Sequence, residues 1–200
     1  MKWYALDIQT LTPEEYEAGY RALSPEQRSR VDGFRFEGDR KRRVAAELLA
    51  RRAVARWCDL EENAVTIARG EKGKPYAPGL PVEFSLSHRE DLVVCVVDDL
   101  PVGIDVELLR PRDLQAVRKV CTPEELRYLF GKDPAPEDFG YTEDPDRLER
   151  FYRLWTGKEA CAKRAGEGLS SLHKCHPLEE ENLFYENTGK YLIAICKTGK

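Results

Sequence analysis

Two carboxylates stand two residues apart in the segment 102–107, which reads VGIDVE. Side chains alternate along an extended strand, so Asp105 and Glu107 share one face while Ile104 and Val106 share the other. This pattern fits a half-buried edge strand whose polar face lies in water. It fits equally well a site for a hard cation such as Mg²⁺, which prefers oxygen ligands.

A third carboxylate, Glu159, occurs in FYRLWTGKEACAKRA, a segment with helical periodicity. On a helix it lies at the flank of an apolar arc formed by Phe151, Leu154, Trp155 and Ala162. Lys163 follows four residues later, which is the spacing of an ordinary helix-surface ion pair. A carboxylate beside apolar side chains is poorly solvated, however, and its basicity rises, which is how a general base is made.

Basic residues cluster in the segment 40–43, at the start of a predicted helix. Cations there oppose the helix dipole, which favours anions at that end. The cluster is therefore either a solvated basic face or a place where an anion such as a phosphate binds.

Further groups suited to phosphate flank a predicted strand over 82–88. The glycine-rich loop before it carries Lys72 and Lys74, although it lacks the spacing of a P-loop. Ser85 and Ser87 share one face of the strand, and His88 ends it. A lone histidine is usually structural, but one beside hydroxyls and basic loops can donate to a phosphate.

Two long helices are expected to position these groups. Helical spacing of apolar residues predicts one helix over 39–58, with Asp39 as its N-cap, and a second over 146–165, closed by Gly166. Between them, 114–130 predicts one or two short helices with a capping signature at 122–125. The stretch 131–146 predicts a loop.

Alternating and apolar runs predict the strands. They lie at 1–10, 82–88, 183–186 and 191–196, with a hairpin over 92–107 that turns around 98–101. The order helix, glycine-bearing loop and strands thus occurs twice, which indicates two related α+β halves that meet near residue 100.

Composition narrows the class of protein. The 200 residues carry a net charge of −4, which argues against a general nucleic-acid binder, and no run of about 18 apolar residues predicts a membrane helix. The six cysteines form no CxxC pair, and several lie in apolar runs. We therefore expect a reduced, cytoplasmic protein with neither nucleic-acid nor membrane partners.

The motif GIDVE followed by WTGKEACAKRAGEGL resembles the signature of the 4′-phosphopantetheinyl transferases. A basic helix start, GKP and a strand with Ser-His precede it in the family's order, so the similarity runs from about 24 to 172. Size and layout look most like the two-lobed, surfactin-synthetase-activating type. The resemblance implies a pseudo-twofold α+β fold with the active site between two subdomains, 1–100 and 101–200.

The resemblance also implies the reaction. A monomeric enzyme transfers 4′-phosphopantetheine from coenzyme A to a serine of an apo acyl or peptidyl carrier protein and releases 3′,5′-ADP. Subdomain 1–100 would bind the 3′-phosphate and adenosine. Subdomain 101–200 would supply the metal ligands and the catalytic residues.

The resemblance assigns these roles to particular positions. The implied ligands of Mg²⁺, or of Mn²⁺ as a substitute, are Asp105, Glu107 and Glu159. Glu159 is implied to deprotonate the carrier serine, and the further implied catalytic residues are Lys163, Asp105 and His88. The residues implied to bind coenzyme A are Arg30, Arg43, Lys74, Ser87, His88, Lys158 and Lys163.

Two other functions stay as alternatives. A Mg²⁺-dependent nuclease or phosphatase could use the same acidic pair, but Leu109 stands where restriction-type nucleases place a lysine. A non-catalytic module that binds coenzyme A or a carrier protein would be expected to lose one of the acidic or lysine positions. The sequence departs from the transferase pattern at Arg89, which replaces the second serine of the family's Ser-His-Ser.

Overall fold

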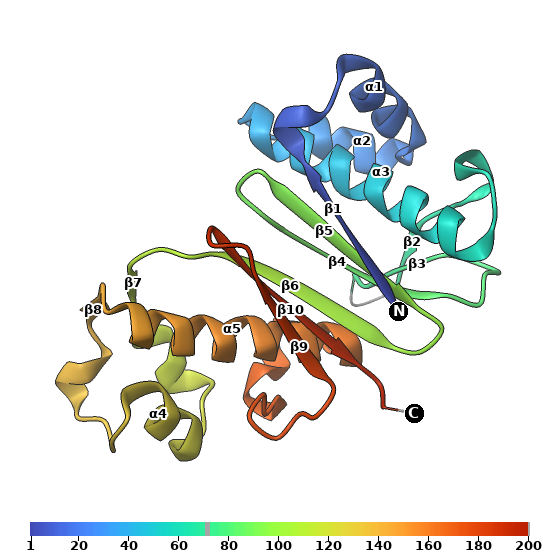
Figure 1. The fold of residues 1–200 in the computed structure, drawn as a ribbon. Coiled ribbons are helices and arrows are strands. Elements are labelled where there is room, and N and C mark those ends of the chain that lie inside the picture. The colour runs from blue at the N-terminus through green and yellow to red at the C-terminus, as the bar shows by residue number, and fades with distance from the viewer. Residues whose placement is uncertain (71–72, 200) are drawn as a thin grey trace.

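The computed structural model describes residues 1–70 and 73–199, and they form two three-stranded antiparallel sheets (Figure 1). The first has the order β1-β5-β4, with strands Lys2–Asp7, Leu92–Asp98 and Glu83–Arg89. The second has the order β6-β10-β9, with strands Val102–Leu108, Tyr191–Lys197 and Leu183–Asn187. All six strands were predicted from the sequence, and the α+β class is confirmed.

The predicted hairpin over 92–107 is wrong, because β5 and β6 belong to different sheets. β5 pairs with β1 and β4, whereas β6 pairs with β10. β5 forms a hairpin with the preceding strand β4 and pairs on its other side with the distant β1, while β6 pairs with the distant β10. The apolar side chains of β5 and β6 therefore meet across the two sheets and not along one ladder. The turn at 98–101 therefore passes the chain from one sheet to the other.

Each sheet carries one long helix on its outer side (Figure 1). Helix α3, Glu37–Cys58, packs on β5, β4 and β1, and helix α5, Pro145–Ala165, packs on β6 and β10. α5 ends at Gly166 in the left-handed conformation, as predicted. It begins at Pro145, one residue before the predicted start, with Asp144 as its N-cap.

The start of α3 corrects the sequence prediction. The helix begins at Glu37 with Phe36 as its N-cap and no side-chain cap, so Asp39 lies within the first turn. Glu37 and Asp39 place negative charge at the end of the helix where the dipole favours it. The cations of 40–43 therefore follow an acidic first turn, with Asp39 bound to Arg42 at 2.6 Å.

Three shorter helices each begin with a reciprocal capping box. They are α1 (Pro13–Ala22), α2 (Pro25–Asp32) and α4 (Pro123–Phe130). The remaining strands are β2 (Ala68–Arg69), β3 (Pro75–Tyr76), β7 (Arg112–Asp113) and β8 (Tyr141–Thr142). Short 3-10 helices occur at Ile8–Thr10, Glu62–Ala64, Gln115–Lys119, Pro136–Phe139 and Leu169–Lys174. No helix within these described residues is both long enough and apolar enough to cross a bilayer.

Of the five apolar clusters of buried residues in the described part of the chain, three show how the layers are held together. One lies between α3 and the first sheet, and another joins α4 and α5. The third lies between the sheets, where Val94 and Val96 of β5 meet Ile104 and Val106 of β6. This third cluster explains the sequence pattern of 102–107, because its apolar face is buried between sheets while its acidic face is turned toward α5.

Gly103 lets α5 lie directly against β6. A Cβ atom at this position would stand 2.0 Å from the carbonyl oxygen of Ala160 and 2.5 Å from the backbone nitrogen of Arg164. No side chain fits between these backbones. The glycine therefore fixes the distance between the acidic face of β6 and the helix that carries Glu159.

Replacing Gly103 with alanine should destabilise the protein by about 3 kcal/mol, at the upper end of overpacking costs, because the new methyl group must displace backbone atoms of α5. Gly33→Ala is the matched control, since its Cβ would meet only ordinary contacts at 3.5 Å; it should change stability by less than about 0.5 kcal/mol. Urea unfolding of both variants measures the difference. Equal stability of Gly103→Ala and the parent protein would contradict this packing constraint.

Candidate active site

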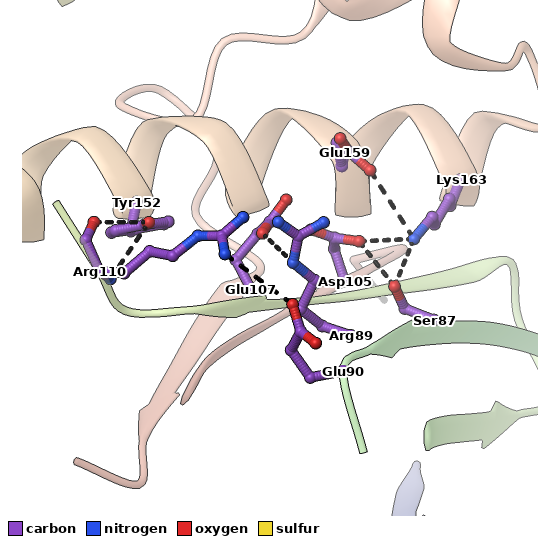
Figure 2. A network of polar contacts seen from close by, with 9 residues as sticks. All are labelled: Ser87, Arg89, Glu90, Asp105, Glu107, Arg110, Tyr152, Glu159 and Lys163. Carbon is purple, nitrogen blue, oxygen red and sulfur yellow. Dashed lines mark hydrogen bonds and ion pairs between the residues drawn. The ribbon is translucent and has the colours of Figure 1, made fainter. Parts of the chain in front are cut away.

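Three carboxylates converge where α5 crosses β6 (Figure 2). Asp105 and Glu107 come from β6 and Glu159 comes from α5; one oxygen of each lies within 4.8 Å of the others. The structure thus brings together the three residues expected to bind a metal. Their meeting depends on the close approach at Gly103, two residues before Asp105.

Two of these carboxylates are buried with unsatisfied oxygen atoms. Asp105 is 2% exposed and Glu107 is 8% exposed, and Asp105 Oδ2 and Glu107 Oε2 accept no hydrogen bond. Buried polar atoms normally have partners, so such orphans need an explanation. Three convergent carboxylates, two of them with unsatisfied buried oxygen atoms, are the donor set that a hard divalent cation requires, and these residues fit Mg²⁺ or Mn²⁺.

Lys163 connects this trio to the first sheet. Its Nζ donates to Asp105 Oδ1 at 2.6 Å and to Ser87 Oγ at 2.9 Å, and it lies 4.0 Å from Glu159 Oε2. Ser87 on β4 donates in turn to Asp105 Oδ1 at 2.8 Å. The ordinary helix ion pair considered from the sequence is thus the longest of the lysine's contacts, and Asp105 is its main partner.

The environment of Glu159 makes it a candidate base. Burial raises the pKa of this carboxyl to about 7, the negative charge of Asp105 adds to the increase, and Lys163 opposes it. Burial also raises the pKa of Glu107, against the effect of Arg89. A carboxylate with a pKa near neutrality can accept a proton from a substrate at physiological pH.

Arg89 places a cation beside the trio. Its Nε lies 3.2 Å from Glu107 Oε2, in an ion pair without hydrogen-bond alignment. The sequence showed Arg89 as a departure from the transferase motif without revealing its partner. The alternation of side chains along β4 could have predicted this position, because Ser85, Ser87 and Arg89 share the face of the strand that meets β6.

A cavity of about 460 Å³ lies beside Lys163. Residues of α3, the β3–β4 region and the C-terminal part of α5 line it. Its cationic and titratable lining residues, apart from Asp39, are Arg42, Arg43, Arg69, Lys74, His88 and Lys163. No sequence pattern distinguishes Arg69, and Arg42 stands out in the sequence only as part of the basic run 40–43. Lys72 lies outside the described residues.

Among the described residues, the cavity lining carries more cations than carboxylates. Within residues 1–70 and 73–199, Arg43 and Arg69 form no ion pair within 4.0 Å, and the carboxylate whose charge acts on both, Glu47, is itself paired with Arg51. Desolvation and the charge of Arg69 lower the pKa of Arg43. The pKa of His88 is lowered by desolvation within the cavity and by Arg42 and Lys163, so its imidazole tends to be neutral. Such a site favours a ligand with several negative charges.

Lys74 lies at the edge of this cavity and connects it to α5. Its Nζ lies 3.0 Å from Glu83 Oε2 and 3.4 Å from the carbonyl oxygen of Arg164. Arg30 is placed differently from the expectation that it binds coenzyme A. It does not line the cavity, and its exposed guanidinium pairs with Glu26 at 2.7 Å.

The position of Lys158 corrects the expectation that it binds coenzyme A. Its side chain is fully buried on the face of α5 that turns away from the cavity, and Nζ donates to Glu125 Oε1 at 2.8 Å. Carbonyl groups of Leu172 and Cys175 accept its other hydrogen bonds. Residues 158 and 159 are neighbours and point to different sides of the helix, so only Glu159 reaches the site.

Comparison with known proteins defines the class. Residues 10–99 match a family model described as 4′-phosphopantetheinyl transferase, N-terminal, and residues 101–199 match the 4′-phosphopantetheinyl transferase superfamily. A 4′-phosphopantetheinyl transferase of Bacillus subtilis is 32% identical over 172 residues, which cover 85% of this chain and 72% of the relative. The chain belongs to the 4′-phosphopantetheinyl transferase family.

Relatives extend beyond that species. The 4′-phosphopantetheinyl transferase psf-1 of Bacillus pumilus is 32% identical over 175 residues, covering 85% of this chain and 71% of its own. L-aminoadipate-semialdehyde dehydrogenase-phosphopantetheinyl transferase of Pongo abelii is 27% identical over 169 residues, covering 78% of this chain and 52% of its own. The family is therefore shared with proteins from bacteria and a mammal.

Lys158→Met should lower the free energy of unfolding by about 3–5 kcal/mol, because it leaves the buried carboxylate of Glu125 without its cation. The double variant Lys158→Met with Glu125→Gln removes both charges and should recover much of that loss. Urea unfolding measures both. A stable Lys158→Met protein with selectively weakened coenzyme A binding would instead support a ligand-binding lysine.

The stability of the metal-free protein should fall as pH rises from about 4.5 to above 7, relative to Glu159→Gln. The folded pKa of Glu159 is raised above the unfolded value, so its contribution is fully present below the unfolded pKa and lost as pH passes the folded pKa. Thermal unfolding in the presence of a chelator checks this. Parallel pH profiles for the two proteins would show that Glu159 is not perturbed.

Proposed function

We propose that the protein transfers the 4′-phosphopantetheine group of coenzyme A to a serine of an apo acyl or peptidyl carrier protein and releases 3′,5′-ADP. The observation that carries this proposal is the position of Lys163, which lies between a trio of carboxylates and a cavity rich in cations. Coenzyme A has a diphosphate and a 3′-phosphate, and such a molecule needs both features. The names of the relatives support the same activity.

The cavity would bind coenzyme A through its phosphates. Arg43 and Arg69 on the α3 side offer two guanidinium groups for the 3′-phosphate, because neither is neutralised by a described carboxylate. Lys74 and His88 would contact the nucleotide between that end and Lys163. Lys163 would donate to the diphosphate.

Asp105, Glu107 and Glu159 would hold Mg²⁺, or Mn²⁺ in its place. When bound, the ion would neutralise negative charge on the diphosphate. Lys163 keeps Asp105 in position through its 2.6 Å contact, and Ser87 fixes the same carboxylate from the other sheet.

Glu159 would accept the proton of the carrier serine, the role that the family resemblance implies for this position. The serine oxygen would then attack the phosphorus next to pantetheine, and the bond between this phosphorus and the bridging oxygen would break. Lys163 would donate to the phosphate oxygens as the leaving 3′,5′-ADP gains charge.

Mass spectrometry tests the transfer. The protein is incubated with coenzyme A, Mg²⁺ and a panel of apo carrier proteins from fatty-acid, polyketide and nonribosomal peptide synthesis, and a carrier serine should gain the mass of phosphopantetheine. Glu159→Gln should bind coenzyme A and lose turnover by at least about 100-fold. A panel on which no carrier is modified would overturn the proposed function.

Arg43→Ala should weaken coenzyme A binding at least about tenfold and weaken 3′-dephospho-coenzyme A binding far less, because only coenzyme A has the 3′-phosphate. Arg40→Ala is the control, since this arginine lies on the same helix and does not line the cavity. Isothermal titration calorimetry measures the six affinities of the parent protein and the two variants for the two ligands. Equal weakening of both ligands would remove Arg43 from the 3′-phosphate site.

A further inference from the structure

Two cysteines that the proposed reaction does not use are in direct contact. Cys161 on α5 and Cys196 on β10 place their Sγ atoms 3.0 Å apart, and both residues are buried as free thiols. Cys161 belongs to the helix that carries Glu159 and Lys163. Cys196 belongs to the strand that pairs with β6.

Contacts between the backbones of α5 and its sheet place the two cysteines next to each other. Cys196 is the cross-strand partner of Gly103, the residue at which α5 lies directly on the sheet. One turn beyond Cys161, the guanidinium of Arg164 donates to the carbonyl oxygen of Lys197 at 2.9 Å. Helix and strand are thus fixed to each other next to both cysteines.

A second cavity reaches one of these two cysteines, Cys161, which is 5% exposed. This cavity of about 360 Å³, separate from the one beside Lys163, is lined by Cys161, Arg164, Cys175 and Glu180 among others. Cys196 has no exposed surface and lies behind Cys161. This arrangement gives the two thiols different roles, because only Cys161 can meet a reagent from solution.

We propose that Cys161 and Cys196 form a reversible disulfide site that takes peroxides entering through the second cavity. The sulfur of Cys161, as thiolate, attacks one oxygen of hydrogen peroxide; the O–O bond breaks, hydroxide leaves, and Cys161 becomes a sulfenic acid. The sulfur of Cys196 then attacks the Cys161 sulfur, the S–O bond breaks, and the oxygen leaves as water with the proton of Cys196. Two thiols and one peroxide thus give one disulfide and two waters.

The neighbouring groups favour a disulfide over a metal site. Glu180 is the third group near the two sulfur atoms, but it already accepts from Arg164 at 2.7 Å and from the backbone nitrogen of Asn182 at 3.3 Å. The guanidinium of Arg164 beside this cluster repels a metal cation. The same charge favours a thiolate and a departing hydroxide.

Oxidation should change the active site, an expectation that rests on the proposed function. The sulfur atoms must move about 1 Å closer to reach a covalent S–S distance of about 2.05 Å. We expect this movement to shift α5 against β10, and Ala194 of β10 is the cross-strand partner of Asp105. A displacement of about 1 Å in a catalytic arrangement lowers the rate on the order of 10²-fold.

Peptide mapping tests the site on the native protein. The folded protein is treated with hydrogen peroxide, alkylated and digested without reduction, and the Cys161 and Cys196 peptides should appear linked, lighter by two hydrogen atoms. The transfer rate of the oxidised protein should fall by about 10- to 100-fold and return with dithiothreitol. Cys196→Ser should form no such link, whereas Cys58→Ser, which changes a thiol at the end of α3, should behave as the parent protein.

Four results would overturn the proposal: no link at peroxide levels that oxidise Cys58, a link from Cys161 to Cys175, one zinc ion retained per chain by the pair, or an unchanged rate in the linked protein. A failure of the proposed transferase function would give a different result from a failure of the disulfide proposal. The fully reduced protein would then transfer nothing, and the peptide map alone would decide whether the disulfide site exists.

Discussion

The contact between the backbones of α5 and β6 at Gly103 is the constraint on which the site depends. Helices normally pack on sheets through side chains, which keep the backbones apart. Here the missing side chain lets the carbonyl group of Ala160 approach the strand directly. The carboxylates of Asp105 and Glu159 consequently meet, although 53 intervening residues separate them in the sequence. The same approach brings Cys161 to Cys196.

Electrostatics explains why such a cluster of like charges is tolerated. Lys163 and Arg89 each contribute one positive charge to the trio, and Ser87 donates a hydrogen bond to Asp105 from the other sheet. Removing a charge from water costs free energy unless an opposite charge lies close to it. The pKa of Glu159 is raised because Lys163 offsets only part of the cost of burying this carboxylate beside Asp105. The cavity beyond Lys163 shows the opposite imbalance, with an excess of positive charge. A ligand with several phosphates fits this division.

Local sequence patterns predicted most helices and strands, but they did not predict which elements distant in the sequence pack together. Strand alternation placed Asp105 and Glu107 on one face, and helical spacing placed Glu159 and Gly166 correctly. The hairpin over 92–107 was wrong because apolar runs do not specify which strand they pair with. Lys158 was misassigned because a sequence motif gives the order of residues but not the side of the helix to which each side chain points. Its partner Glu125 lies 33 positions away in the sequence, so no local pattern indicates their ion pair. Arg69 escaped notice because nothing in its neighbourhood distinguishes it from an exposed turn.

The turn at 98–101 acts as a tether between the parts of the site. Ser87 and His88 precede it in the chain, and Asp105, Glu159 and Lys163 follow it, so no segment on one side of the turn contains the whole site. A connection this short keeps the two sheets at a high effective concentration, and their association costs little entropy once each has formed. The apolar cluster between the sheets then determines how they are oriented relative to each other. Cutting the backbone at this turn would convert a single folding reaction into a bimolecular association whose strength depends on protein concentration.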